Sequence, residues 1–171
     1  MFEKLFDFIL NFLEFFRCAV IRNQYEDGLV LRMGKYHRDL KLGFNFLLPF
    51  YLERFRLVNI VTKTDNIGSQ SLYSKDEVGV LVSVFIRYKI RNVKRWILEA
   101  ENPAEVLGDV TYGVIGEHVL AKTWEEINRP QFHTDIFTTL KGIASRDLGV
   151  SLEGIQFCDL TRSKTFRILN T

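Results

Sequence analysis

The stretch VGVLVSVFIRYKI, residues 78–90, decides the fold. Every even-numbered position from Val80 to Ile90 carries an apolar or aromatic side chain, whereas Ser83, Arg87 and Lys89 fall on odd-numbered positions. Because successive side chains of a β-strand point to opposite faces, this period of two predicts a strand with one face in a core and the other half exposed.

Shorter strands are predicted on the N-terminal side of this one. Residues 18–25 and 29–33 are apolar enough for strands, and Asp27-Gly28 between them is typical of a hairpin, because a type I′ turn needs positive φ at both central residues. We also expect strands at 55–61 and 69–73, and a basic loop from Gly34 to Gly43.

On the C-terminal side the period changes from 2 to 3.6 at residue 102. Asn102 as a cap, Pro103 at the first helical position and Glu105 in a capping box predict a helix start. Thr123 and Glu126 predict a short helical turn by the same spacing. A further helix is expected from Pro130 with a stop at Gly149, followed by a strand over 151–160. The order of strands, then helices, then a closing strand indicates one α+β domain.

Composition excludes two classes of protein. The chain has 171 residues, 23 basic against 21 acidic, and two cysteines, Cys18 and Cys158. A formal charge of +2 is far from the strongly basic balance of a protein that binds phosphate backbones, so no nucleic-acid partner is expected. Two distant cysteines exclude a disulfide-stapled secreted domain and favour a reducing compartment.

The first sixteen residues, MFEKLFDFILNFLEFF, hold six of the fifteen phenylalanines. As a helix they reach only about 24 Å against a hydrocarbon core of about 30 Å, and they carry several charges, so a simple transmembrane span is not expected. A narrow polar stripe on a mostly apolar helix predicts an amphipathic helix over residues 1–17 that lies in a membrane interface. Packing of this helix among its own copies, or in a groove of its own domain, is the alternative. The predicted membrane-associating residues are Phe2, Leu5, Phe6, Phe8, Ile9, Phe12, Leu13 and Phe16.

A second stretch has the composition of a membrane contact. Four cations between Gly34 and Gly43 are followed by an aromatic-rich run in which Phe44, Phe46 and Phe50 are candidates for insertion. The alternative is that residues 44–51 fold inward and the cations are merely solvated. Cys18, directly after the predicted helix, is a candidate acylation site, and a plain strand cysteine is the alternative reading.

Catalytic and metal-binding motifs are missing from the sequence. It has no phosphate-binding loop, nucleophile elbow, HExxH or CxxC. Cys158 with His118 or His133 is the one formal nucleophile and base pair, and we expect Cys158 to be a buried, inert thiol in a strand. We therefore predict no enzyme activity, no cofactor and no metal.

An ordered series of short motifs resembles the SPFH (band 7) family of stomatins, prohibitins and flotillins. The series consists of 24–36 (QYEDGLVLRMGKY), 42–50 (LGFNFLLPF), 74–80 (SKDEVGV), 84–90 (VFIRYKI), Asn102-Pro103, 114–117 (VIGE), 125–128 (EEIN) and 148–150 (LGV). The resemblance implies an SPFH fold with antiparallel strands packed against helices. It also implies an N-terminal membrane anchor, and homo-oligomers that organise or modulate membrane proteins, including proteases and channels.

Taken together, we expect a membrane-associating helix at 1–17, an SPFH domain at 18–160 and a short tail at 161–171. Most members of the family continue into a long helical segment, so we expect no large closed cage from a chain that ends soon after its last strand. The predicted function is a non-enzymatic scaffold on the cytoplasmic face of a membrane, with membrane lipid, further copies of itself, and a membrane protease or channel as partners. A soluble homo-oligomer whose N-terminal helices pack together without lipid is the alternative.

Overall fold

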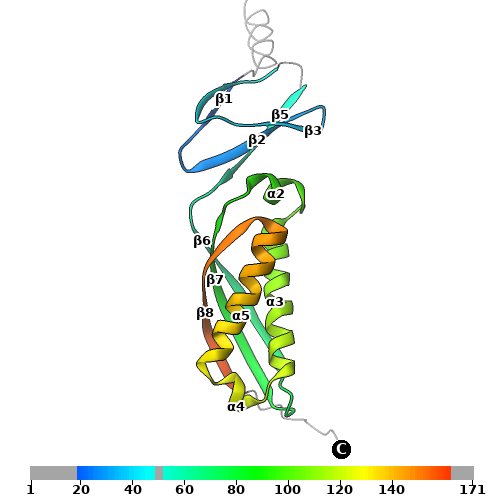
Figure 1. The fold of residues 1–171 in the computed structure, drawn as a ribbon, viewed down its shortest axis with the longest axis vertical. Coiled ribbons are helices and arrows are strands. Elements are labelled where there is room, and N and C mark those ends of the chain that lie inside the picture. The colour runs from blue at the N-terminus through cyan, green and yellow to red at the C-terminus, as the bar shows by residue number, and fades with distance from the viewer. Residues whose placement is uncertain (1–18, 49–51, 163–171) are drawn as a thin grey trace, which may run out of the picture. The chain divides into compact units, whose positions relative to one another are not determined.

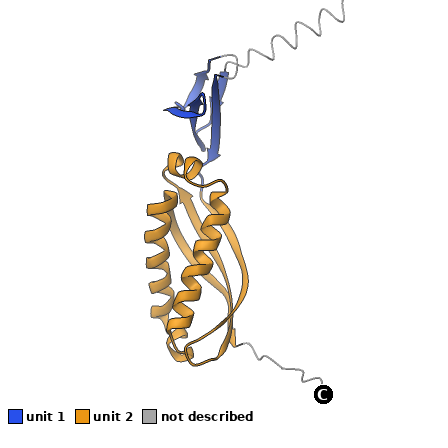
Figure 2. Ribbon diagram, turned by 90° about the vertical axis from the view of Figure 1, so that its right-hand side faces the viewer, with its two compact units in different colours: residues 1–61 blue, residues 62–171 orange. Residues whose placement is uncertain are grey.

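The computed structural model describes residues 19–48 and 52–162, and it divides the chain into two compact units, Met1–Val61 and Thr62–Thr171 (Figure 1, Figure 2). Both strands and helices are present, which confirms the α+β prediction. No boundary at residue 61 was predicted, and the expected segments 1–17, 18–160 and 161–171 stay predictions.

Unit 1 contains strands only among its described residues. They are β1 (Ala19–Arg22), β2 (Glu26–Arg32), β3 (Lys35–Asp39), β4 (Gly43–Phe46) and β5 (Glu53–Asn59). β1 and β4 form a two-stranded antiparallel ribbon, and β3, β2 and β5 form a second antiparallel sheet in that order. Val20, Val30, Leu40 and Leu47 are buried together, with Leu57 packed against them, so the ribbon and the sheet share one small core.

The predicted hairpin at Asp27-Gly28 is wrong, because both residues lie inside β2. A Cβ on Gly28 would lie 2.3 Å from the carbonyl oxygen of Arg56, so this glycine allows close approach to β5 and does not form a turn. The tight turn is at Met33-Gly34, where φ is 50° and 82° as a type I′ turn requires. The predicted basic loop from Gly34 to Gly43 is likewise wrong in part, because it contains β3.

Unit 2 is a three-stranded sheet with helices on one face (Figure 1, Figure 2). Its strands are β6 (Lys63–Tyr73), β7 (Gly79–Ile90) and β8 (Val150–Arg162), antiparallel in the order β6-β7-β8. Between β7 and β8 the chain forms α2 (Val93–Leu98), α3 (Pro103–Ala121), α4 (Trp124–Ile127), α5 (Pro130–Ile143) and a π-helical turn, η1 (Ala144–Leu148). The short helix α2 was not predicted.

The core of unit 2 follows the predicted periodicity. All six even-numbered residues of β7 from Val80 to Ile90 are buried, beneath fully buried side chains of α3 and α5 such as Ile115 and Phe132. The predicted capping box of Thr123 and Glu126 is present at α4. Asn102 precedes α3 as predicted, but its side chain makes no capping hydrogen bond. Gly149 ends the helical segment in the left-handed conformation, with φ of 66°, as predicted.

Candidate functional site

The β1–β4 ribbon presents an apolar face to the surface. In its antiparallel register Ala19 lies opposite Phe46 and Ile21 lies opposite Phe44, so all four side chains share one face. Ile21, Phe44 and Phe46 are 64%, 69% and 64% exposed. Large aromatic side chains are normally buried, so a continuous face of this kind is typical of a surface that meets another apolar phase. We call Ala19, Ile21, Phe44 and Phe46 the ribbon face.

The inner side of β4 explains why its phenylalanines point outward. Asn45 is buried, and its side-chain amide donates to the carbonyls of Lys41 and Gly43 and accepts from the Lys41 N–H. Leu47 is buried in the unit 1 core. Because side chains alternate along a strand, burial of Asn45 and Leu47 places Phe44 and Phe46 on the outer face. The expectation that this run folds inward as a whole is therefore wrong for these two residues.

The other residues of the predicted membrane contact are divided between described and undescribed parts of the chain. Outside the described residues lie Phe50, Cys18 and the eight apolar residues from Phe2 to Phe16 that were predicted to contact the membrane. Lys41 and Leu42 are exposed beside β4, and the guanidinium of Arg38 donates to the Phe46 carbonyl at 2.6 Å. The structure thus places one cation directly on the backbone of the ribbon.

A buried carboxylate holds the end of β4 to the second sheet. The Glu53 side chain is 2% exposed, and its Oε2 accepts from the backbone N–H of Leu48 at 3.1 Å. Its Oε1 accepts from Nε and Nη2 of Arg32 at 3.1 and 2.7 Å. Nε2 of His37 lies 3.8 Å from Oε1, and Nη2 of Arg38 lies 4.0 Å from Oε2.

Burial alone acts to raise the pKa of Glu53, but the Arg32 hydrogen bonds, the Leu48 N–H and the charges of Arg32 and Arg38 outweigh it and hold that pKa below its ordinary value. No sequence pattern predicted this cluster, since its members come from β2, β3 and β5 and from Leu48, which follows β4.

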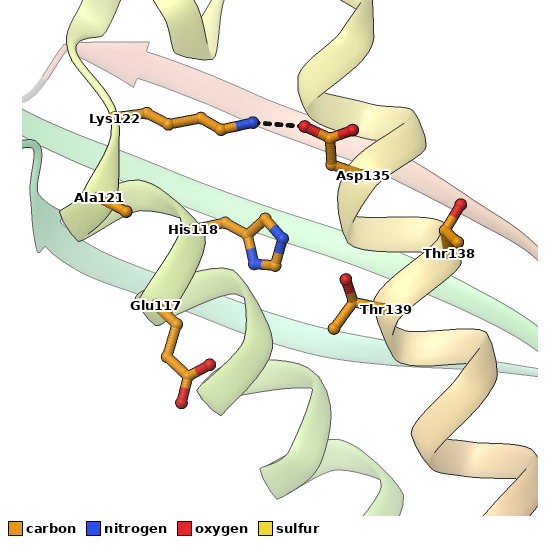
Figure 3. Close-up of a pocket in the computed structure, with 7 residues that line it drawn as sticks. All are labelled: Glu117, His118, Ala121, Lys122, Asp135, Thr138 and Thr139. Atoms are coloured by element: carbon orange, nitrogen blue, oxygen red, sulfur yellow. Dashed lines mark hydrogen bonds and ion pairs between the residues drawn. The ribbon is translucent and has the colours of Figure 1, made fainter.

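Unit 2 has a polar groove of about 550 Å³ between α3 and α5 (Figure 3). Figure 3 shows His118 pointing from α3 toward α5, and the Lys122 ammonium bonded to the Asp135 carboxylate across the groove. His118 donates from Nδ1 to the Val114 carbonyl at 2.9 Å. Lys122 lowers the pKa of Asp135, first through this hydrogen bond and then through its charge. Lys122 and Asp135 thus pair with each other and His118 bonds to the backbone, while Glu117, Thr138 and Thr139 complete the polar lining.

The predicted nucleophile Cys158 does not meet a histidine within the described residues. Its thiol lies 4.0 Å from the Gln156 carbonyl, while His133 packs its ring 4.2 Å from that of Phe157. Cys158 is exposed, so the expectation of a buried thiol is wrong. The cause is a β-bulge, because Ser83 pairs with Asp159 and Val84 pairs with Phe157, which leaves Cys158 as the extra residue.

Two features are absent from residues 19–48 and 52–162. No three side chains of histidine, cysteine, aspartate or glutamate gather there in a way that would hold a metal ion. None of the helices in these ranges is both long and apolar enough to cross a bilayer.

Comparison with known proteins gives a consistent result over nearly the whole described chain. A family model described as "SPFH domain / Band 7 family" matches residues 20–168. Stomatin-1 of Caenorhabditis elegans is 24% identical over 169 residues, which is 94% of this chain and 50% of that protein. The modulator of FtsH protease HflK of Escherichia coli is 25% identical over 137 residues, which is 77% of this chain and 32% of HflK.

An uncharacterized protein of Methanocaldococcus jannaschii is 36% identical over 86 residues, half of this chain and 43% of its own. The chain therefore spans between about a third and a half of the length of the relatives it matches.

Proposed function

Since the chain belongs to the SPFH domain / Band 7 family, we propose that it is a non-enzymatic membrane-associated scaffold that assembles with copies of itself and organises or modulates membrane proteins. Residues 1–17 attach it to the cytoplasmic face of the membrane as an amphipathic helix, and acylation of Cys18 would reinforce the attachment. A membrane protease or channel is the proposed class of partner, and one relative, HflK, is named as a modulator of the FtsH protease.

The ribbon face is the observation that carries the proposal. It begins at Ala19, directly after the proposed helix, so chain connectivity alone keeps the two apolar elements close together. Exposed Leu42 and Leu48 flank β4 and extend the apolar surface along the chain. A ribbon of two short strands that displays Phe44 and Phe46 can insert both rings at the level of the lipid headgroups without exposing unpaired backbone groups to the hydrocarbon.

The energy available from the ribbon face is substantial. Full burial of a large apolar side chain contributes about 1.5–3 kcal/mol. Phe44 and Phe46 are each about two-thirds exposed, so their transfer into an interface contributes about 2–4 kcal/mol together. That corresponds to a factor of about 30 to about 1,000 in the partition coefficient.

Vesicle flotation of the full chain tests the assignment. Replacing Phe44 and Phe46 with serine should lower the vesicle partition coefficient, obtained from the bound fraction at several lipid concentrations, by the factor just given. Deletion of residues 2–17 should move the protein into the soluble fraction. Tyr73→Ser with Leu120→Ser is the matched control, because these side chains are 57% and 58% exposed and belong to unit 2. Equal loss of flotation in both double variants would refute a specific role for the ribbon face.

The competing function is a soluble homo-oligomer in which the same apolar surfaces contact other copies. Light scattering in detergent-free buffer, combined with vesicle co-sedimentation, separates the two. A membrane scaffold should need vesicles or detergent to stay dispersed and should co-sediment with vesicles. A stable oligomer of defined mass that ignores vesicles would support the competing function alone.

A further inference from the structure

Strand β5 lies at the edge of its sheet. It pairs with β2 over all seven of its residues, and the order β3-β2-β5 gives it no second partner among the described strands. An edge strand carries a row of backbone N–H and C=O groups that can accept a further strand. We call Glu53–Asn59, with the groups on its unpaired side, the β5 edge.

The hydrogen bonds at the two ends of the ladder show which groups face outward. Met33 N–H donates to the Leu52 carbonyl, and Ile60 N–H donates to the Tyr25 carbonyl, both at 2.9 Å. Hydrogen-bonded pairs alternate with non-bonded pairs in an antiparallel ladder, so the backbone groups of Arg54 and Arg56 point toward β2. Those of Phe55 and Leu57 therefore point away from β2, toward the open side.

Two arginines stand on one face of this strand. Arg54 and Arg56 lie opposite Leu31 and Leu29 of β2, on the face of the sheet opposite to that of Val30. They line a depression of about 380 Å³ together with Leu31, Met33 and Gly34. Cationic walls and an apolar floor fit a ligand that carries both negative charge and apolar groups.

The arginines of the β5 edge differ from the other arginines of unit 1. Arg22 forms an ion pair with Asp27, and Arg32 and Arg38 surround Glu53. Neither Arg54 nor Arg56 forms an ion pair or side-chain hydrogen bond with any residue in the described part of the chain. The described residues of unit 1 contain seven Lys and Arg against four Asp and Glu, so the surrounding field also favours an anionic ligand.

Met33 adds an adaptable contact next to this edge. It is 80% exposed at the tip of the β2–β3 hairpin, with a φ of 50° that a methionine rarely adopts. Strained residues that persist in a fold cluster at binding sites, and flexible methionine side chains suit surfaces that accommodate more than one apolar neighbour.

We propose that the β5 edge is a docking site for an extended acidic segment of a partner protein, which adds to the sheet as an antiparallel strand. The backbone of that segment pairs with Phe55 and Leu57. Residues opposite Arg54 and Arg56 then occupy non-hydrogen-bonded positions, where cross-strand side chains approach most closely. Acidic residues at these two alternate positions pair with the arginines, and an apolar neighbour contacts Met33.

A second copy of this chain does not fit the same edge. Antiparallel pairing of two β5 strands would bring arginines opposite arginines, and like charges directly opposite each other destabilise a sheet. A lipid headgroup would meet the charges but would leave the outward backbone groups of Phe55 and Leu57 unused. The combination of a free edge and alternate cations therefore favours a protein segment.

Fluorescence anisotropy with a labelled nine-residue peptide tests the proposal, using the full chain in detergent. The peptide consists of threonine and valine with glutamates at two alternate positions. We expect Arg54→Glu with Arg56→Glu to weaken binding at least tenfold. Lys35→Glu with Lys41→Glu changes the net charge equally and should weaken it less than threefold. A peptide with lysines in place of the glutamates should bind the Arg54→Glu, Arg56→Glu variant and not the original chain.

Hydrogen exchange supplies the structural readout. Bound peptide should slow exchange of the Phe55 and Leu57 amides. The proposal would be overturned if the original chain did not bind the peptide, or if the Lys35→Glu, Lys41→Glu variant weakened binding as much as the arginine variant. Equal binding of a peptide with two adjacent glutamates would also overturn it. Binding of anionic vesicles that depends on Arg54 and Arg56 and displaces the peptide would assign the site to lipid instead. The peptide assay contains no vesicles, so its failure is distinct from failure of the proposed membrane attachment.

Discussion

Replacing Glu53 with glutamine should loosen unit 1 without disturbing unit 2. The substitution preserves the shape of the side chain but removes the negative charge that accepts two hydrogen bonds from Arg32. It also weakens the acceptor for the Leu48 N–H. Hydrogen bonds to charged groups contribute about 1.5–3 kcal/mol each when buried. Because Arg32 is 44% exposed and can find water, we expect a loss of about 2 kcal/mol in all.

Hydrogen exchange followed by mass spectrometry measures this loss in the unit where it occurs. A free-energy change of about 2 kcal/mol should raise the opening equilibrium, and with it the exchange rate of β2 and β5 amides, by about 30-fold. Segments of α3 and α5 should keep their protection. Asp39→Asn removes a carboxylate from an exposed strand of the same unit and serves as the control, with an expected change below about 0.5 kcal/mol.

The effect of Glu53 should depend on pH in one direction. Its pKa in the folded protein lies below the ordinary value of 4.5, so its charge stabilises the fold fully above that value. The stabilisation is lost as the pH falls through the folded pKa. The difference in the free energy of opening of unit 1 between the original chain and the Glu53→Gln variant should stay constant from pH 7 to about pH 5. It should shrink below pH 4.5. A difference that does not change with pH, or equal acceleration in both units, would refute the reasoning.

Two further substitutions test the turn and the close strand approach of unit 1. Gly28→Ala should destabilise unit 1 by about 2 kcal/mol or more, because the new Cβ would clash with the Arg56 backbone. Gly142→Ala in α5 meets open space and should be neutral or stabilising. A urea titration followed by hydrogen exchange compares the two variants. Met33→Asn should stabilise unit 1 by about 1 kcal/mol, because asparagine tolerates positive φ, and an unchanged unfolding midpoint would contradict the type I′ assignment.

Much of unit 2 could be predicted, because its strands and helices are indicated by residues close together in the sequence. The alternation along β7, the capping box before Trp124 and the stop at Gly149 each depend on residues within one element, and each is confirmed. α2 was missed because its six residues, Val93–Leu98, are too short for a helical period to be recognised. The exposure of Cys158 depends on the register between β8 and β7, which cannot be predicted from the sequence of β8 alone.

Unit 1 was harder to predict because its pairing is non-local. Asp27-Gly28 has the composition of a turn, but it lies within β2 because Gly28 is needed where β5 approaches closely. The true turn has methionine at Met33, where the usual pattern has asparagine or aspartate. Phe44 and Phe46 are exposed because Asn45 between them is buried, and their role at a membrane stays a prediction. The Glu53 cluster and the β5 edge exist only once β2, β3 and β5 have come together.

The pairing of β7 with β8 also sets the order in which the chain matures during synthesis. The central strand of unit 2 is made about 70 residues before the end of β8, and at about 5–20 residues per second that interval lasts about 4–14 s. Every strand of unit 1 has been translated by then, so β1 can pair with β4, and β2 with β3 and β5, while β7 still lacks one neighbour. The nascent protein therefore has its ribbon face available to a membrane before the rest of the molecule has closed.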